Sequence, residues 1–304
     1  MATSAKPMAL VIGTGQLGQE LARVRTSHLL VKVVGRDTLD VTDAAATQAA
    51  IRKVRPSIVL NATAYTAVDR AEAEPAAAFA VNRDGAATLA TVCAELGIPL
   101  IHVSTDYVFD GDSGPYTENS AVAPRSVYGD SKLQGEIEIR SGLERHIILR
   151  TAWLFSSFGN NFVKTMLRLS ATRSEIQVVD DQFGCPTPAA ALAQAIVALA
   201  EKAVGGGSLA WGTYHFAGQP ATTWRRFAEH IFDRAAAIGL IGSVPRVIPI
   251  TTAQYPTAAR RPANSVLSCD ALAALGLTAP DWHAGLAAVL DDLRLARITG
   301  SVVH

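Results

Sequence analysis

The sequence predicts an α/β protein with a doubly wound, parallel Rossmann sheet and a smaller C-terminal lobe. Its first half alternates short apolar runs with longer amphipathic segments, which is typical of parallel strands covered by helices on both faces. A G-x-G-x-x-G stretch from Gly13 to Gly18 follows the first apolar run directly and opens the first amphipathic segment. Both observations favour the class of fold in which ligands bind at the carboxyl ends of the strands.

The elements of the first half follow in order along the chain. Strands are expected at residues 9–12, 31–34, 58–61, 100–104 and 147–149, each a short apolar run. Helices are expected at residues 16–26, 44–54, 75–96 and 125–141, the third of which stops at Gly97. A helix after each strand carries the chain back to begin the next parallel strand.

The regular alternation of short apolar runs and amphipathic segments ends after Thr151. Helices are expected at residues 160–170 and 189–203, a strand at 176–179, a loop at 184–188, a flexible link at 205–208 and a Pro-rich stretch at 245–262. We therefore expect a dinucleotide-binding Rossmann domain at residues 1–151. Residues 152–304 are expected to form mainly a substrate-binding lobe, with some of the chain crossing back to the first domain.

Composition narrows the function classes. The 304 residues carry no formal net charge, which argues against a nucleic-acid surface or an anionic membrane as partner because both need a basic excess. Three scattered cysteines indicate neither a disulfide framework nor a zinc cluster and fit a reducing compartment. The first apolar run is too short for a signal peptide, and no run reaches the roughly 20 residues of a membrane span. We expect a cytoplasmic protein.

The glycine motif predicts a dinucleotide site. Gly13, Gly15 and Gly18 allow a tight turn and a close approach of the backbone to a pyrophosphate, which the free N–H groups of the following helix bind. The alternative is an ordinary Gly-rich turn, but the strand before it and the helix after it favour binding.

Residues after the second and third strands bear on the choice of cofactor. Arg36 can pair with a 2′-phosphate and favours NADPH, whereas Asp37 can supply the contact typical of NADH. Asp40 and the amide of Val41 can meet the adenine, although Thr42 or Asp43 there also suits a helix N-cap. The third strand leads into small residues that leave room for a cofactor, in the stretch from Asn61 to Thr66.

A second constellation predicts carbonyl reduction. Tyr128 and Lys132 lie four residues apart on one face of a predicted helix, and Thr105 lies at the tip of the fourth strand. A phenol with a pKa of about 10 is a poor acid, but a nearby ammonium stabilises the phenolate. The hydroxyl of Thr105 can orient the carbonyl. Taken alone, the Tyr–Lys spacing also fits a pair of surface residues.

These residues together resemble the extended short-chain dehydrogenase/reductase superfamily. Longer stretches resemble one family within it, the dTDP-4-dehydrorhamnose reductases, and the resemblance covers nearly the whole chain. The stretches are residues 61–69, 104–111, 150–155, 159–162, 180–187 and 255–265.

The resemblance implies the reduction of the 4-keto group of dTDP-4-dehydro-6-deoxy-L-mannose to dTDP-L-rhamnose. Tyr128 would be the proton donor, and Lys132 its partner and a ligand of the nicotinamide ribose. The sugar nucleotide would contact Thr105, Asp106, Trp153 and Arg261; Trp153 also suits a core position, and Arg260 can exchange roles with Arg261. The resemblance further assigns Gly15, Gln16 and Leu17 to the phosphates, Asp40 and Val41 to the adenine, and Ala64, Tyr65 and Thr66 to the cofactor wall.

Two departures from the family pattern stand out. The phosphate loop is one residue shorter than the usual G-x-x-G-x-x-G. Some relatives hold Mg²⁺ between subunits with glutamates; Glu20 matches one such position, but only Pro188 and alanines follow Thr187. We therefore expect no metal site, and a monomer or homodimer.

Other functions occur on the same fold. A dehydratase usually carries Asp-Glu after the threonine of the fourth strand, whereas Tyr107 follows Asp106 here. Epimerases share the Tyr–Lys pair. Some relatives are NADP-binding regulatory subunits of methionine adenosyltransferase, and the intact Thr105, Tyr128 and Lys132 argue against that role.

Overall fold

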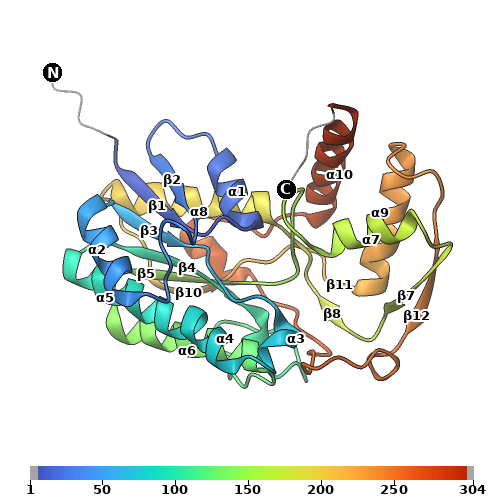
Figure 1. The fold of residues 1–304 in the computed structure, drawn as a ribbon, viewed down its shortest axis with the longest axis horizontal. Coiled ribbons are helices and arrows are strands. Elements are labelled where there is room, and N and C mark those ends of the chain that lie inside the picture. The colour runs from blue at the N-terminus through green and yellow to red at the C-terminus, as the bar shows by residue number, and fades with distance from the viewer. Residues whose placement is uncertain (1–5, 300–304) are drawn as a thin grey trace.

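A computed structural model describes residues 6–299, and its centre is a six-stranded parallel sheet (Figure 1). The strand order is β10-β5-β4-β3-β1-β2, which places the first strand inside the sheet. The strands are β1 (Met8–Ile12), β2 (Leu30–Val34), β3 (Ile58–Asn61), β4 (Leu100–Thr105), β5 (His146–Thr151) and β10 (Gly212–His215). The chain reverses its direction of travel across the sheet between β2 and β3, so β1 and β3 flank the position where this fold class binds ligands.

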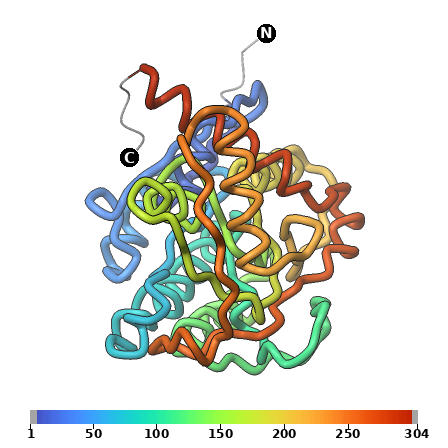
Figure 2. The backbone as a smooth tube through the Cα atoms, turned by 90° about the vertical axis from the view of Figure 1, so that its right-hand side faces the viewer, coloured from blue at the N-terminus to red at the C-terminus, as the bar shows by residue number. Residues whose placement is uncertain are grey.

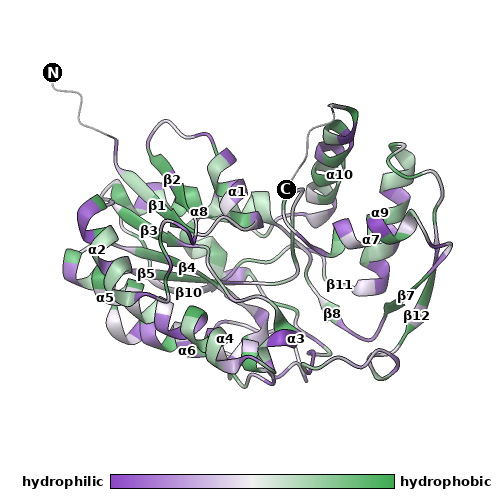
Figure 3. Cartoon of the chain, in the orientation of Figure 1, coloured by the Kyte–Doolittle hydropathy of each residue, from purple (hydrophilic) through white to green (hydrophobic). Residues whose placement is uncertain are grey.

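Helices cover both faces of the sheet, as predicted. On one face α1 (Gln16–Arg23) and α8 (Ala189–Val204) pack together; α2 (Ala44–Val54), α5 (Gly85–Leu96) and α6 (Val127–Gly142) cover the other (Figure 1). Two separate apolar clusters fill the space between the sheet and these layers. Figure 3 shows the strands as the most continuously hydrophobic part of the chain and the helices as mixed. This contrast explains why the strands could be found as apolar runs.

The helix expected at residues 75–96 is interrupted. It consists of α4 (Pro75–Phe79), a π-helical turn (Ala80–Asp84) and α5. The widened turn buries Asn82, whose amide bonds to the backbone of Tyr65 and to the hydroxyl of Ser131. The spacing of apolar residues does not predict such a turn, because its visible consequence is the burial of a polar side chain and not a change in the apolar pattern.

Within residues 6–299, the second lobe is built around three helices and a two-stranded parallel sheet. The helices are α7 (Phe162–Ser170), α9 (Trp224–Ala237) and α10 (Trp282–Thr299), and the strands are β7 (Glu175–Val179) and β12 (Arg246–Ile250). Figure 2 views this lobe from its outer side. A third apolar cluster, which includes Phe227 and Trp282, holds these elements together.

Three short segments differ from expectation. The predicted loop at 184–188 contains the last residue of the short strand β8 (Phe183–Gly184) and the whole of the short strand β9 (Thr187–Pro188), and the Pro-rich stretch contains β12. After α8 the chain returns to the central sheet as β10, which pairs with β5. The remaining short helices are α3 (Val68–Ala71) and 3₁₀ turns. Within residues 6–299, no helix combines the length and hydropathy that crossing a membrane requires.

Candidate active site

A cleft of about 810 Å³ opens at the carboxyl ends of the central strands and reaches residues of the second lobe. Almost all of the predicted site residues line it. They are Gly13, Gly15, Gln16, Leu17, Arg36, Asp40, Val41, Ala64, Tyr65, Thr66, Thr105, Asp106, Tyr128, Lys132, Trp153 and Arg261. Gly18 does not line the cleft, and the lining also includes Trp224, which no sequence pattern indicated.

The glycine loop has the geometry that a phosphate-binding turn needs. Gly13 has a φ of 117°, and a side chain there would meet the carbonyl oxygen of Ala62, after β3, at 2.8 Å. A side chain at Gly18 would lie 1.9 Å from the carbonyl oxygen of Gly13, so Gly18 permits the helix to pack on the turn. Gly15, in contrast, faces open space and precedes the first residue of α1. The loop therefore leaves room for an anion at the amino end of α1.

Arg36 lies at the rim beyond β2. Its side chain is largely exposed and forms an ion pair with Asp40, with Nε and Oδ2 2.9 Å apart. Asp40 also accepts hydrogen bonds from Thr42, and these bonds hold the pKa of its carboxyl below the ordinary value. Asp43, one of the two residues proposed as an N-cap, caps α2 by accepting from Ala46.

The hydroxyl-bearing end of β4 faces Tyr128. Both Thr105 and Tyr128 are buried, and their hydroxyls interact. Burial raises the pKa of Tyr128 above its usual value, so the phenol is firmly protonated. Burial likewise raises the pKa of Asp106 to about 6, and one of its carboxylate oxygens lies 3.0 Å from the Thr105 hydroxyl.

Two polar atoms of the cleft are buried without a hydrogen-bond partner among the described residues. They are Oδ2 of Asp106 and Oγ1 of Thr151, at the ends of neighbouring strands. An unsatisfied buried oxygen costs about 1–3 kcal/mol, and a bound ligand with hydroxyl groups would remove that cost.

The amine of Lys132 contacts two residues of β4, His102 and Val103. Its nitrogen lies 3.1 Å from Nε2 of His102 and donates to the carbonyl of Val103 at 2.7 Å. The side chain is fully buried. Burial lowers the pKa of Lys132 to about 8, although the charge of Glu136 acts in the opposite direction.

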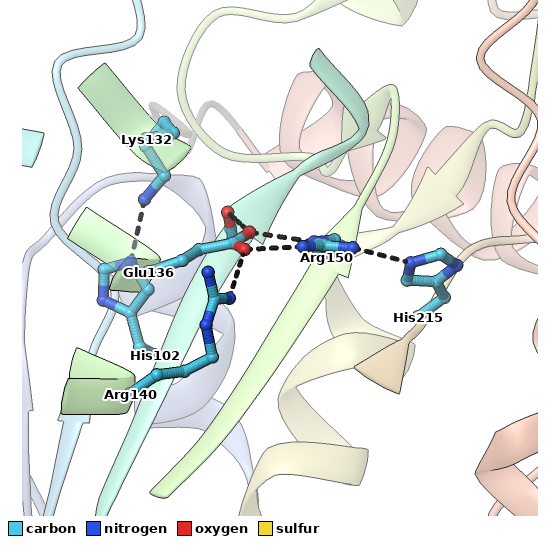
Figure 4. Close-up of polar contacts among 7 residues, drawn as sticks. His102, Lys132, Glu136, Arg140, Arg150 and His215 are labelled. Atoms are coloured by element: carbon cyan, nitrogen blue, oxygen red, sulfur yellow. Dashed lines mark hydrogen bonds and ion pairs between the residues drawn. The ribbon is translucent and has the colours of Figure 1, made fainter. Parts of the chain in front are cut away.

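Glu136, one helical turn beyond Lys132, organises a buried ion network (Figure 4). Arg150 of β5 donates to both of its carboxylate oxygens, at 2.9 and 2.7 Å, while Arg140 and Ser104 add further bonds. Burial alone would raise the pKa of Glu136, but the bonds and charge of Arg150 outweigh it and keep the pKa below the ordinary value. This network ties α6, which carries Tyr128 and Lys132, to β4 and β5.

Trp153 forms the aromatic side of the cleft together with Trp224. Their rings stack with centroids 3.5 Å apart and an interplanar angle of 10°. Trp153 has a φ of 45°, unusual for a residue with a side chain, and Gly184 leaves the space that its indole fills. The strained backbone turns the tryptophan toward the second lobe rather than into the core of the sheet.

Arg261 reaches the cleft from the segment after β12. It donates to Oδ2 of Asp69 at 2.7 Å and to the hydroxyl of Tyr107 at 3.2 Å. Glu20, in contrast, is buried on α1 and accepts a 2.5 Å hydrogen bond from Ser156. Asn161 caps α7, whereas Asn160 lines the cleft.

The sheet, the glycine loop and the Tyr–Lys pair define an extended short-chain dehydrogenase/reductase with a Rossmann fold. The chain matches the RmlD substrate binding domain over residues 8–295. It therefore belongs to the dTDP-4-dehydrorhamnose reductase family.

Three relatives illustrate the similarity. A dTDP-4-dehydrorhamnose reductase of Aggregatibacter actinomycetemcomitans is 43% identical over 91% of this chain and 96% of its own length. One of Sinorhizobium fredii is 42% identical over 91% of this chain and 94% of its own. The crystal structure of the Bacillus anthracis enzyme in complex with NADP matches with a TM-score of 0.87 and 35% identity, covering 94% of this chain and 99% of that one.

Proposed function

We propose that this chain is an NADPH-dependent dTDP-4-dehydrorhamnose reductase, which converts dTDP-4-dehydro-6-deoxy-L-mannose into dTDP-L-rhamnose. The observation that carries the proposal is the buried, protonated Tyr128 beside Thr105, in a cleft that begins at the glycine loop and ends at Arg261. Membership of the family supports the substrate and the direction of the reaction.

The residues present fit the cofactor. The turn at Gly13 and Gly15 leaves space for the diphosphate, with Gln16, Leu17 and Gly18 continuing into α1. Arg36 at the rim would pair with the 2′-phosphate, and Asp40 and Val41 would meet the adenine. Ala64, Tyr65 and Thr66 would form one wall of the cofactor site. Asn82 holds this segment in place by accepting a hydrogen bond from the backbone N–H of Tyr65.

The chemistry divides between the cofactor and the protein. Bound NADPH supplies a hydride to C4 of the sugar. Thr105 donates to the keto oxygen and holds it near the phenol of Tyr128, which transfers its proton to that oxygen as the C–H bond forms. The resulting phenolate is stabilised by Lys132 once the lysine is charged, and it regains a proton from solvent.

The remaining substrate contacts follow from the lining of the cleft. The unpaired oxygen of Asp106 would accept from a sugar hydroxyl, and the stacked Trp153 would pack on the sugar ring. Arg261 would pair with the diphosphate because guanidinium matches phosphate geometry. On this proposal the sheet half of the chain binds mainly the cofactor, and the second lobe completes the sugar-nucleotide site.

The test is NADPH oxidation by the purified chain with dTDP-4-dehydro-6-deoxy-L-mannose, with the product identified by NMR. Formation of dTDP-L-rhamnose at the rate of NADPH loss supports the proposal. NADPH binding without turnover, together with co-purification of a methionine adenosyltransferase, would replace the proposal with the regulatory role. A product of the other configuration at C4 would overturn the assignment of dTDP-L-rhamnose as the product.

A further inference from the structure

His102 contacts Lys132 and has no assigned role. It belongs to β4, is 1% exposed, and sits between Lys132 of α6 and Asn61 at the end of β3. Nδ1 of its ring lies 2.9 Å from Nδ2 of Asn61, and Nε2 lies 3.1 Å from the nitrogen of Lys132. The contact between His102 and Lys132 is drawn in Figure 4.

The orientation of the Asn61 amide is determined by its other neighbour. The backbone N–H of Thr63 donates to Oδ1 of Asn61 at 3.0 Å, and the Thr63 hydroxyl donates to the same oxygen at 2.6 Å. A backbone N–H can only donate, so the atom that it meets must be the amide oxygen. The NH₂ group of Asn61 therefore faces His102.

That orientation decides the tautomer of the imidazole. The NH₂ of Asn61 can only donate, so Nδ1 of His102 must accept and carries no proton. A neutral imidazole then carries its proton on Nε2, the nitrogen next to Lys132. Burial lowers the pKa of His102 well below its usual value, which keeps the ring neutral.

An N–H on Nε2 needs an acceptor at the position of the lysine nitrogen. An ammonium has three donors and no acceptor, so two donors would oppose each other at 3.1 Å. A neutral amine resolves the conflict, because its lone pair accepts from His102 while one of its N–H groups donates to the carbonyl of Val103.

We propose that His102 is a positioning residue that favours the neutral amine of Lys132 over its ammonium form in the cofactor-free protein, through the donor chain from Thr63 to Asn61 to His102. The proposal deepens the proposed function, since it assigns a regulator to the lysine of that same site. Lys132 becomes the partner of a phenolate only after it gains a proton and leaves the Nε2–H of His102.

The other charged and titratable groups around Lys132 do not supply the missing acceptor. On α6, Glu136 favours a charged lysine, but both of its oxygens are occupied by Arg150, Arg140 and Ser104. Tyr128, one turn earlier on α6, is protonated and interacts with Thr105 at the tip of β4. Burial therefore prevails and lowers the pKa of Lys132.

A dependence of turnover on pH follows. Because Lys132 must be charged to stabilise the phenolate, the rate should fall as the pH rises through the pKa of the lysine, which is about 8. In His102→Gln the amide oxygen can turn toward Lys132 and accept from an ammonium. A hydrogen bond to a charged group is worth enough to raise the pKa by about one to two units. The basic limb of the rate profile should move to higher pH by the same amount.

Two NMR measurements on the cofactor-free protein test the proposal. The first reads the ¹⁵N shifts of the His102 ring in the wild type, where a proton on Nε2 is expected and a proton on Nδ1 overturns the proposal. The second follows the ¹³Cε signal of Lys132 against pH; the chain has six lysines, and Lys132→Met assigns the signal. A midpoint near 8 that rises in His102→Gln is expected.

The matched control is His146→Gln, which removes another buried histidine, at the opposite end of neighbouring β5. It should leave the Lys132 midpoint unchanged. A wild-type midpoint at the ordinary value for lysine, or equal shifts in both variants, overturns the proposal. Neither measurement needs turnover, so an inactive protein with the expected tautomer would contradict the proposed function alone. The tautomer is read in the wild type, so the test survives a variant that fails to fold.

Discussion

Arg261 donates to Asp69 at 2.7 Å and thereby joins two cleft-lining segments that are 192 residues apart in the sequence. Asp69 lies in the first turn of α3, the short helix after β3, and it also accepts from the backbone N–H of Ala259. The guanidinium of Arg261 therefore pairs with Asp69 and also lines the cleft. Burial alone would lower the pKa of Arg261, but its interactions with Tyr107 and Asp69 outweigh burial and raise that pKa.

The first prediction concerns this arginine. Arg261→Lys keeps the charge but loses the two-pronged geometry that suits a diphosphate. The Michaelis constant for the sugar nucleotide should rise about tenfold or more, a loss comparable to one charge-assisted bond. The dissociation constant for NADPH, measured by fluorescence, should not change.

Arg260→Lys is the matched control, since Arg260 adjoins Arg261 and does not line the cleft. The diphosphate contact is contradicted if Arg261→Lys leaves the Michaelis constant unchanged but weakens NADPH binding or strongly lowers the melting temperature. Arg261 would then have a structural role through its bond to Asp69. An effect of Arg260→Lys on the Michaelis constant would move the diphosphate contact to that residue.

The second prediction concerns the choice of cofactor. Arg36→Ala should weaken NADPH binding by roughly one to two orders of magnitude and leave NADH nearly unaffected, because only NADPH presents a phosphate to the guanidinium. In the structure Arg36 already pairs with Asp40, so the loss of NADPH affinity in Arg36→Ala should lie at the lower end of that range. Isothermal titration with both cofactors measures the effect. Arg25→Ala, on the exposed loop after α1, is the control, and equal losses for the two cofactors would make Arg36 structural.

Part of this site could be predicted because its residues fall in contiguous patterns. The glycine loop, the Tyr–Lys spacing and the hydroxyl at the end of β4 each depend on a few neighbouring residues, and the carboxyl ends of parallel strands bring them to one edge. The tryptophan pair, in contrast, joins Trp153 to Trp224 through tertiary packing alone.

His102 shows the same limit. The sequence predicts only that a histidine inside an apolar strand is a core residue. The role proposed for His102 depends on its contacts with Asn61 and Lys132, which lie 41 and 30 residues away in the sequence. Prediction of the fold had the same limit. The short strand β10 is recognised only by its pairing with β5, and the π-helical turn at Asn82 depends on polar contacts rather than on apolar periodicity.

The third prediction concerns stability. Glu136→Gln leaves Arg150 buried without its carboxylate, and breaking a buried ion pair costs about 3–5 kcal/mol. Because the folded-state pKa of Glu136 is lowered, its contribution is present above the unfolded pKa of about 4.3 and is lost as the pH falls through the folded value.

Urea unfolding at neutral pH and at pH below about 4 tests this prediction. The gap between wild type and Glu136→Gln should narrow at the lower pH. Glu138→Gln, an exposed position on the same helix, should behave as wild type. A gap below about 1 kcal/mol at neutral pH would show that the network contributes little to stability.

The most direct test of the account is single-turnover NADPH oxidation by Tyr128→Phe. The variant keeps the buried ring and loses only the proton donor, so the rate should fall by roughly 10²–10⁴ while the dissociation constant for NADPH stays at the wild-type value. Tyr214→Phe, which removes a tyrosine hydroxyl on β10 outside the cleft, is the control and should keep its rate. A Tyr128→Phe rate within a few-fold of wild type would contradict the assignment of Tyr128 as the acid.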